Sequence, residues 1–178
     1  DSPAIAVDTF PGAGQGNVYV AWRHFNPGPG LGGIRFSRSV APSYGAVWGA
    51  TGGYLRQDVD LTGFKIDEMN FPWVAVARNH WVYVFWLERY GDAPGIGVDN
   101  TIMYAVSRDQ GATFSLPMLW WITSTSLPGG DLGLLNGADS YTAPQVVFSR
   151  TQNWGIIVFN DNLPGVTGNN SDVVVERF

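Results

Sequence analysis

The chain has 178 residues and a formal net charge of −5, and charged residues make up only 14% of it, against about a quarter in a typical protein. Its 8 Trp, 7 Tyr and 10 Phe exclude a disordered tail, and its 23 Gly and 11 Pro leave little room for long helices. The absence of cysteine excludes a disulfide framework, a cysteine zinc site and a thiol nucleophile, and the presence of only two histidines argues against a multi-histidine metal site.

Three similar stretches of about 70 residues follow one another along the chain. Each opens with a proline and an apolar segment, at residues 3–7, 72–76 and 144–148. A second apolar and aromatic segment follows at residues 18–22, 82–86 and 156–159, and a third at residues 34–38, 102–106 and 173–177. The first two stretches have a candidate fourth segment at residues 54–61 and 117–123. Short β-branched and aromatic segments bounded by Gly, Pro, Asn or Asp predict β-strands.

Four antiparallel strands per stretch predict an all-β fold built from the blades of a β-propeller. We place blade 1 at residues 1–66, blade 2 at residues 67–138 and an incomplete blade 3 at residues 139–178. The chain would then hold about two and three-quarter blades, whereas closed propellers have roughly four to eight. Because an isolated blade cannot bury both faces, we expect missing residues, other chains or further copies of this chain to complete the ring.

The turn after the third strand of blade 2 carries the specific pattern S-x-D-x-G-x-T-F. Its residues are Ser107, Asp109, Gly111, Thr113 and Phe114. Asp109 can accept backbone N–H groups within its own turn, Gly111 suits a positive φ, and Phe114 would pack back between strands. The pattern resembles the Asp-box (BNR repeat) of the sialidase-like β-propellers, and we expect Asp109 to form the turn rather than to catalyse. In blade 1, Ser39 and Gly45 stand at the positions of the serine and glycine, but the aspartate is missing, which predicts weaker hydrogen bonding there.

The alternating direction of the strands places the longer connections at the end of the blades opposite the Asp-box. These connections are at residues 24–33, 64–71, 87–101, 125–142 and 160–171. Long loops on a rigid scaffold are common places for binding sites, and the resemblance likewise implies an active site on this face. The candidate binding residues on it are His24, Asn26, Asp67, Glu68, Glu88, Arg89, Tyr90, Asp92, Asp99, Asp131, Asp139, Tyr141, Asp161 and Asn162.

These candidates fit three different roles. Carboxylates with Tyr and Arg suit carbohydrate recognition through hydrogen bonds and ring stacking. The same oxygens could bind Ca²⁺, which takes roughly six to eight oxygen ligands. The plainest interpretation is that they are solvated loop side chains.

The resemblance also implies a glycosidase site with three arginines on a carboxylate, a tyrosine nucleophile with a glutamate partner, and an acid/base aspartate. Arg23 and Arg89 lie at the ends of second strands, but blade 3 offers Asn160 and Asp161 at that position. A hydrolase that uses two carboxylates such as Glu88 and Asp67 is a further alternative. Nothing in the sequence sets the distance between those carboxylates, so it assigns no catalytic residue.

The sequence therefore predicts an extracellular or secreted propeller that acts as a non-catalytic binding or assembly module. The alternatives are a fragment of a secreted sialidase-like glycoside hydrolase and a carbohydrate-binding lectin stabilised by Ca²⁺. The expected partners are copies of this chain or other chains, and a glycan. Nucleic acid is a poor partner because Lys65 is the one lysine and no basic stripe exists. No organic cofactor is expected, and no apolar run approaches the roughly 20 residues that span a bilayer.

Overall fold

The computed structural model of the chain describes residues 2–25, 32–49, 53–57, 60–61, 64–90, 100–122, 143–161 and 172–178. All regular secondary structure in this part of the chain is β-strand, so the predicted all-β class is confirmed. No helix long and apolar enough to cross a membrane occurs among these residues.

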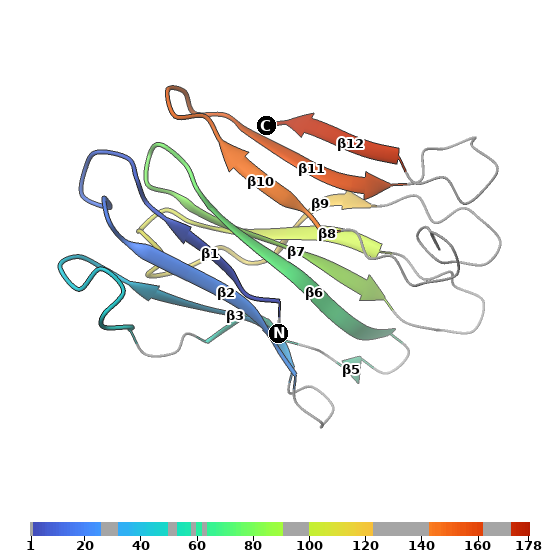
Figure 1. The fold of residues 1–178 in the computed structure, drawn as a ribbon. Helices are drawn as coiled ribbons and strands as arrows, with labels where there is room; N and C mark the ends of the chain where they lie inside the picture. Colours follow the sequence, from blue (N-terminus) through green and yellow to red (C-terminus); the bar gives the residue numbers. More distant parts are fainter. Residues whose placement is uncertain are drawn as a thin grey trace.

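The strands form three antiparallel sheets, and within each sheet every strand pairs with its neighbours in the sequence (Figure 1). The first sheet contains β1 (Ala4–Val7), β2 (Val18–His24), β3 (Gly33–Ser39) and β4 (Tyr54–Gln57). The second contains β5 (Asp60–Leu61), β6 (Phe64–Val76), β7 (Val82–Tyr90), β8 (Asn100–Ser107) and β9 (Met118–Ile122). The third contains β10 (Gln145–Phe148), β11 (Gly155–Asp161) and β12 (Asp172–Arg177).

The three sheets lie face to face with the second sheet in the middle (Figure 1). Strand β6 lies between β1 of the first sheet and β10 of the third, so the opening strands of the three repeats are neighbours. This arrangement is consistent with consecutive blades of a propeller.

Strand β7 of the middle sheet is buried on both faces. Val84 and Trp86 point into the core shared with the first sheet, and Phe85 and Leu87 point into the core shared with the third. Because both faces are covered, the strand shows no alternation of polar and apolar residues from Val82 to Leu87.

Polar contacts between the sheets repeat with the period of the sequence. Four of them join residues that are 72 or 73 positions apart. They are Arg38 Nη1 to the Gln110 carbonyl (2.8 Å), Trp73 Nε1 to the Val146 carbonyl (2.8 Å), Arg78 Nη1 to the Thr151 carbonyl (2.6 Å), and His80 Nδ1 to Asp8 Oδ2 (2.7 Å). Each contact connects one repeat to the next, so the repeat is a structural unit as well as a sequence pattern.

The prediction that residues 64–71 form a connection is wrong, because β6 runs through them. Pro72 favours the start of a strand in the sequence, since proline has no N–H to donate to a β-ladder. In the structure the pairing with β7 shifts between Asn70 and Trp73, which places Pro72 in a bulge where no ladder bond is needed. Phe71, within the same bulge, has a φ of 51°.

Several other strand boundaries also differ from the prediction. The segment at residues 54–61 is not one strand: β4 pairs with β3, whereas β5 pairs with the early part of β6 in the second sheet. Strand β7 continues to Tyr90, β11 continues to Asp161, and His24 belongs to β2. These strands are therefore longer than the sequence indicates, and the connections at the end of the blades with the predicted binding residues are shorter.

Candidate functional site

The S-x-D-x-G-x-T-F turn is closed by the side chains of its own residues. Asp109 Oδ1 accepts the backbone N–H of Thr113 at 2.8 Å, and Asp109 Oδ2 accepts the Thr113 hydroxyl at 2.6 Å. Ser107 Oγ donates to Asp109 Oδ1 at 2.7 Å and accepts the N–H of Gly111, whose φ is 79°. Phe114 packs edge-on against Phe36 of the first sheet, with ring centroids 4.7 Å apart. These contacts give Asp109 a structural role in the turn.

The hydrogen bonds from Thr113 lower the pKa of the Asp109 carboxyl from its ordinary 3.8 to about 2. Because the pKa is lowered in the folded state, the ionised turn stabilises the fold fully above pH 3.8 and loses that contribution as the pH falls towards 2. Asp109 is exposed, so solvent screening keeps the effect below about 1 kcal/mol. We expect Asp109→Asn to be less stable than the native chain at pH 6 and nearly equal to it at pH 2, as measured by urea unfolding. A difference that is the same at both pH values would contradict this account.

The equivalent turn of the first sheet keeps part of the same geometry without the aspartate. Ser39 Oγ accepts the N–H of Gly45 at 2.9 Å, as Ser107 accepts that of Gly111, and the φ of Gly45 is 90°. The Ser43 hydroxyl lies 2.9 Å from Ser39 Oγ and donates to the Val40 carbonyl at 2.6 Å. The Ser43 hydroxyl therefore supplies hydrogen bonds inside a turn that lacks the aspartate.

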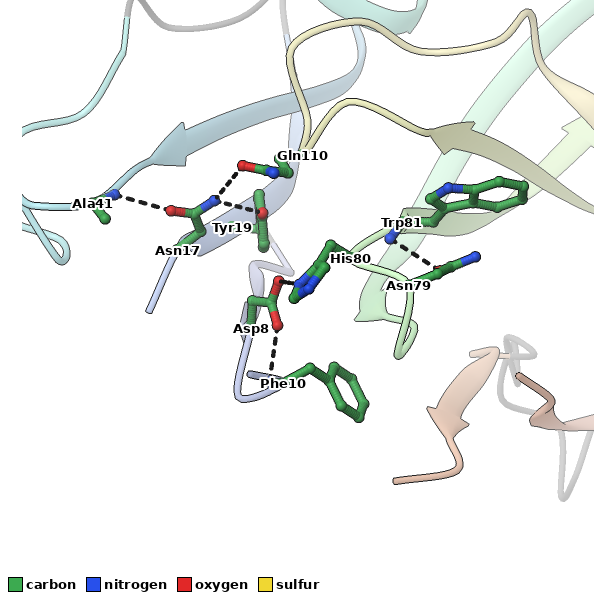
Figure 2. Close-up of polar contacts among 9 residues, drawn as sticks. All are labelled: Asp8, Phe10, Asn17, Tyr19, Ala41, Asn79, His80, Trp81 and Gln110. Atoms are coloured by element: carbon green, nitrogen blue, oxygen red, sulfur yellow. Dashed lines mark hydrogen bonds and ion pairs between the residues drawn. The ribbon is translucent and has the colours of Figure 1, made fainter. Parts of the chain in front are cut away.

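A partly buried acid–base pair joins the first and second sheets at this same end (Figure 2). Asp8 Oδ2 lies 2.7 Å from His80 Nδ1, and Asp8 Oδ1 accepts the N–H of Phe10 at 3.0 Å. The Asp8 side chain is 0% exposed and that of His80 is 20% exposed. Glycines make this close packing feasible, because a Cβ on Gly12 would lie 2.4 Å from His80 Nε2. This packing indicates that His80 has a structural role and links the first and second sheets.

Asn17 provides a second link at this end (Figure 2). Its Nδ2 donates to Tyr19 Oη and to Gln110 Oε1, both at 3.2 Å, and its Oδ1 accepts the N–H of Ala41 at 2.9 Å. The end of the sheets that carries the S-x-D-x-G-x-T-F turn is thus occupied by contacts that hold the sheets together.

At the opposite end, Glu88 on β7 is fully buried and faces the first sheet. Glu88 Oε1 accepts the indole N–H of Trp86 at 2.9 Å and the Nε–H of Arg56 at 3.0 Å. The Arg56 side chain, on β4 of the first sheet, is 30% exposed. A carboxylate that is buried and bonded to two donors is poorly placed to meet a substrate, so this geometry favours a structural role for Glu88 over catalysis.

His24 lies on the other face of the first sheet, together with Tyr54 and Arg35. His24 Nδ1 lies 2.9 Å from Tyr54 Oη, and the Arg35 guanidinium lies 4.5 Å from the centroid of the Tyr54 ring. Arg35 Nε is buried and has no hydrogen-bond partner within the described part of the chain. Arg23, which is 4% exposed, faces the second sheet and stacks on Phe25 at 4.8 Å.

The structure describes the side chains of only part of the predicted binding face. Asp67, Glu68, Arg89, Tyr90 and Asp161 lie within strands β6, β7 and β11, where their backbone but not their side-chain surroundings is described. Asn26, Asp92, Asp99, Asp131, Asp139, Tyr141 and Asn162 lie outside the described residues. Among the residues that are described, no three acidic or histidine side chains gather in a way that could hold a metal ion.

The sequence did not identify Tyr54 and Arg56 as candidate binding residues, although both lie at the end of the sheets opposite the S-x-D-x-G-x-T-F turn. Both lie in a segment predicted as a strand, and their partners His24 and Glu88 come from other strands. The available signal was the charge on Arg56, since an arginine in a strand that packs on a core needs a counter-charge or water.

Comparison with known proteins adds information on the fold. No known protein family has a profile that matches the chain, and no curated protein matches it. Among solved structures, it is similar to the structure titled "Hadza microbial sialidase Hz136", with 16% sequence identity and a TM-score of 0.52 over 90% of this chain. The match spans 32% of that sialidase chain. At this identity the likeness shows a sialidase-like fold and nothing about activity.

Proposed function

We propose that the chain is a propeller segment that acts as an assembly module, in which the outer face of the third sheet packs on the outer face of the first sheet of a second copy. The observation that carries this proposal is the exposure of large apolar side chains on these two faces. The exposed fractions are 68% for Ile5 and 48% for Val7 on β1, and 63% for Val147, 66% for Val173 and 62% for Val175 on β10 and β12. Exposed apolar patches of this kind commonly mark interaction surfaces.

The sequence repeat supports this choice of partner. Ile5 and Val7 stand at the repeat positions of Val74 and Val76, which are buried against the first sheet. Val147 stands at the position of Ala75, which is buried against the third sheet. The outer face of the first sheet therefore corresponds to the face of the second sheet that packs on the first sheet. The outer face of the third sheet corresponds to the face of the second sheet that packs on the third sheet. A contact between these two outer faces would repeat an interface that already exists inside the chain. Contacts of this head-to-tail type form rings when the rotation closes.

Polar donors on the third sheet repeat as well. Arg150 stands at the position of Arg78, which donates to the third sheet, and Gln145 stands at the position of Trp73. Both Arg150 and Gln145 are exposed. By the same repeat, their acceptors on a second copy would be the carbonyls of Phe10 and Ile5.

Light scattering after size exclusion tests the proposal. We expect the native chain to run at a multiple of 19.4 kDa. Val147→Lys should lower that mass towards 19.4 kDa, because a charge on the apolar face opposes its burial. Val47, which is 66% exposed on a loop at the Asp-box end, provides the matched control, and Val47→Lys should leave the mass unchanged. A well-folded native chain that stays at 19.4 kDa as its concentration rises would overturn the proposal.

A glycoside hydrolase of sialidase type is the second candidate, and the likeness to the sialidase structure is the observation that favours it. Because the match covers 32% of that chain, the test belongs on a protein that contains this segment within a closed propeller. A panel of fluorogenic sialosides and neutral glycosides would detect turnover, and a complete lack of turnover would remove this candidate. We also propose an extracellular location, which rests on the amino-acid composition.

A further inference from the structure

The turns that join successive strands lie at one end of the three sheets (Figure 1). They connect β1 to β2, β6 to β7, β8 to β9 and β10 to β11, and the loop that follows β3 lies at the same end. This end, which carries the S-x-D-x-G-x-T-F motif, is the turn end. Arg78 Nη1 donates to the Thr151 carbonyl at 2.6 Å, so the turns of the second and third sheets are bonded to each other. Asn17 joins the first and second sheets in the same way, through Gln110. The turn end therefore presents one fixed surface.

Positive charge gathers at the turn end. Among the described residues of this end, five are arginines and three are acidic. The arginines are Arg38, Arg78, Arg108, Arg150 and Arg177, and the acidic residues are Asp8, Asp109 and Glu176. All of these arginines except Arg38 are exposed, whereas the Asp8 side chain is 0% exposed and pairs with His80. The turn end therefore has an excess of positive charge in a chain whose net charge is −5.

Two of the exposed arginines are held over tryptophan rings. The Arg108 guanidinium lies 4.6 Å from the ring centroid of Trp81, and the Arg177 guanidinium lies 4.8 Å from that of Trp154. The two tryptophans are half-buried and stand at the same position of their repeats, directly before β7 and β11. A guanidinium held over an indole can still donate N–H groups from its edge to a phosphate. Tryptophan itself suits the boundary between water and an apolar layer.

Large apolar side chains also project from the turn end. Tyr44 is 63% exposed and Val47 is 66% exposed in the loop after β3, and Leu116, which follows the S-x-D-x-G-x-T-F motif, is 84% exposed. Hydrogen bonds of Ser39 and Ser43 fix the loop that carries Tyr44 and Val47. These three side chains lie away from β1, β10 and β12, whose outer faces form the proposed contact between copies. The assembly proposal therefore leaves them without a partner surface.

We propose that the turn end binds the surface of an anionic lipid bilayer. The arginines would contact lipid phosphates, and Tyr44, Val47 and Leu116 would enter the headgroup region. A bilayer supplies both negative charge and an apolar layer, whereas an acidic polypeptide supplies mainly the charge. The inference goes beyond the assembly proposal and does not depend on it. Arg78 stays exposed while it donates to Thr151, so Arg150 can make the equivalent contact to a second copy and remain at this surface.

Sedimentation with lipid vesicles tests the proposal on the native chain. We expect binding to vesicles of an equimolar mixture of phosphatidylcholine and phosphatidylglycerol, and little binding to vesicles of phosphatidylcholine alone. The binding should weaken as the salt concentration rises, because salt screens the arginines. Arg108→Gln should lower the affinity for the mixed vesicles about fivefold, the usual effect of one basic residue near an anionic membrane.

Two lysine variants provide a matched pair. Gln152 is exposed in the turn between β10 and β11, and Gln57 is exposed at the opposite end of the first sheet. Gln152→Lys should raise the affinity for the mixed vesicles about fivefold, whereas Gln57→Lys should leave it unchanged. Both variants have the same net charge, so a difference between them reports the location of the charge.

A second pair of variants tests the apolar contribution. Val47→Ser combined with Leu116→Ser should weaken binding to the mixed vesicles about tenfold, because less apolar surface enters the bilayer. Phe25→Ser, at a side chain that is 57% exposed at the opposite end, should bind like the native chain.

The proposal is overturned if the native chain binds neither kind of vesicle, if it binds both equally, or if Gln57→Lys strengthens binding as much as Gln152→Lys. Binding of poly-L-glutamate without binding of the mixed vesicles would also overturn it, because the turn end would then recognise an acidic polypeptide.

Discussion

Replacing Glu88 with leucine is expected to destabilise the chain by about 3 kcal/mol, because breaking a buried ion pair leaves the remaining partner uncompensated. The variant removes the acceptor of two hydrogen bonds, from Trp86 Nε1 at 2.9 Å and from Arg56 Nε at 3.0 Å. The indole N–H would remain buried without that acceptor, and the guanidinium, on a side chain that is 30% exposed, would recover only part of its hydration. Urea unfolding monitored by tryptophan fluorescence at constant protein concentration measures the loss.

The double variant Arg56→Met with Glu88→Leu provides the decisive control. If the pair acts as a buried ion pair, the double variant should be clearly more stable than Glu88→Leu alone, since an apolar replacement of both partners is often close to neutral. A double variant whose loss equals the sum of the two single losses would show that the pair is not coupled. The same set of variants bears on catalysis, because a glutamate that only joins two sheets should be replaceable without a change in any measured turnover.

Much of the fold follows from the sequence because the chain repeats. The prolines at positions 3, 72 and 144 align the three stretches, and the apolar segments after them correspond to β1, the end of β6, and β10. The same rule misleads at Pro72, where a bulge absorbs the proline and β6 begins at Phe64. Whether a proline starts a strand or lies within a bulge depends on the neighbouring strand, and single-sequence patterns carry no record of that pairing.

The candidate site was less predictable than the fold, and Glu88 shows why. A glutamate that follows an apolar strand favours a solvated loop, and the sequence predicts a loop at residues 87–101. In the structure β7 continues past Glu88 through its pairing with β8, and Arg56 and Trp86 provide donors for the carboxylate inside the core. Arg56 belongs to another sheet and lies 32 positions earlier, so no local pattern could reveal the pair.

On the opposite face of the same strand, Phe85→Ala is expected to cost about 3 to 5 kcal/mol, the usual loss for a buried phenylalanine. Phe85 is 0% exposed and lies at the centre of the aromatic cluster between the second and third sheets. Its ring centroid is 5.5 Å from that of Tyr104 and 5.8 Å from those of Trp120 and Phe178. Packed aromatic neighbours collapse poorly into a space of this size, so the cavity should persist.

The location of this loss distinguishes stacked repeats from a single cooperative core. In a stack, each sheet contacts only its neighbours, so Phe85→Ala should weaken hydrogen-exchange protection in β10–β12 and leave β1–β3 largely protected. Glu88→Leu, which faces the first sheet, should produce the reverse pattern from the same strand. Leu116→Ala, at a side chain that is 84% exposed, should change neither. Equal loss of protection across all three sheets in both variants would mean that the chain unfolds as one unit. That result would contradict the proposal that the exposed outer faces repeat the interfaces between neighbouring sheets.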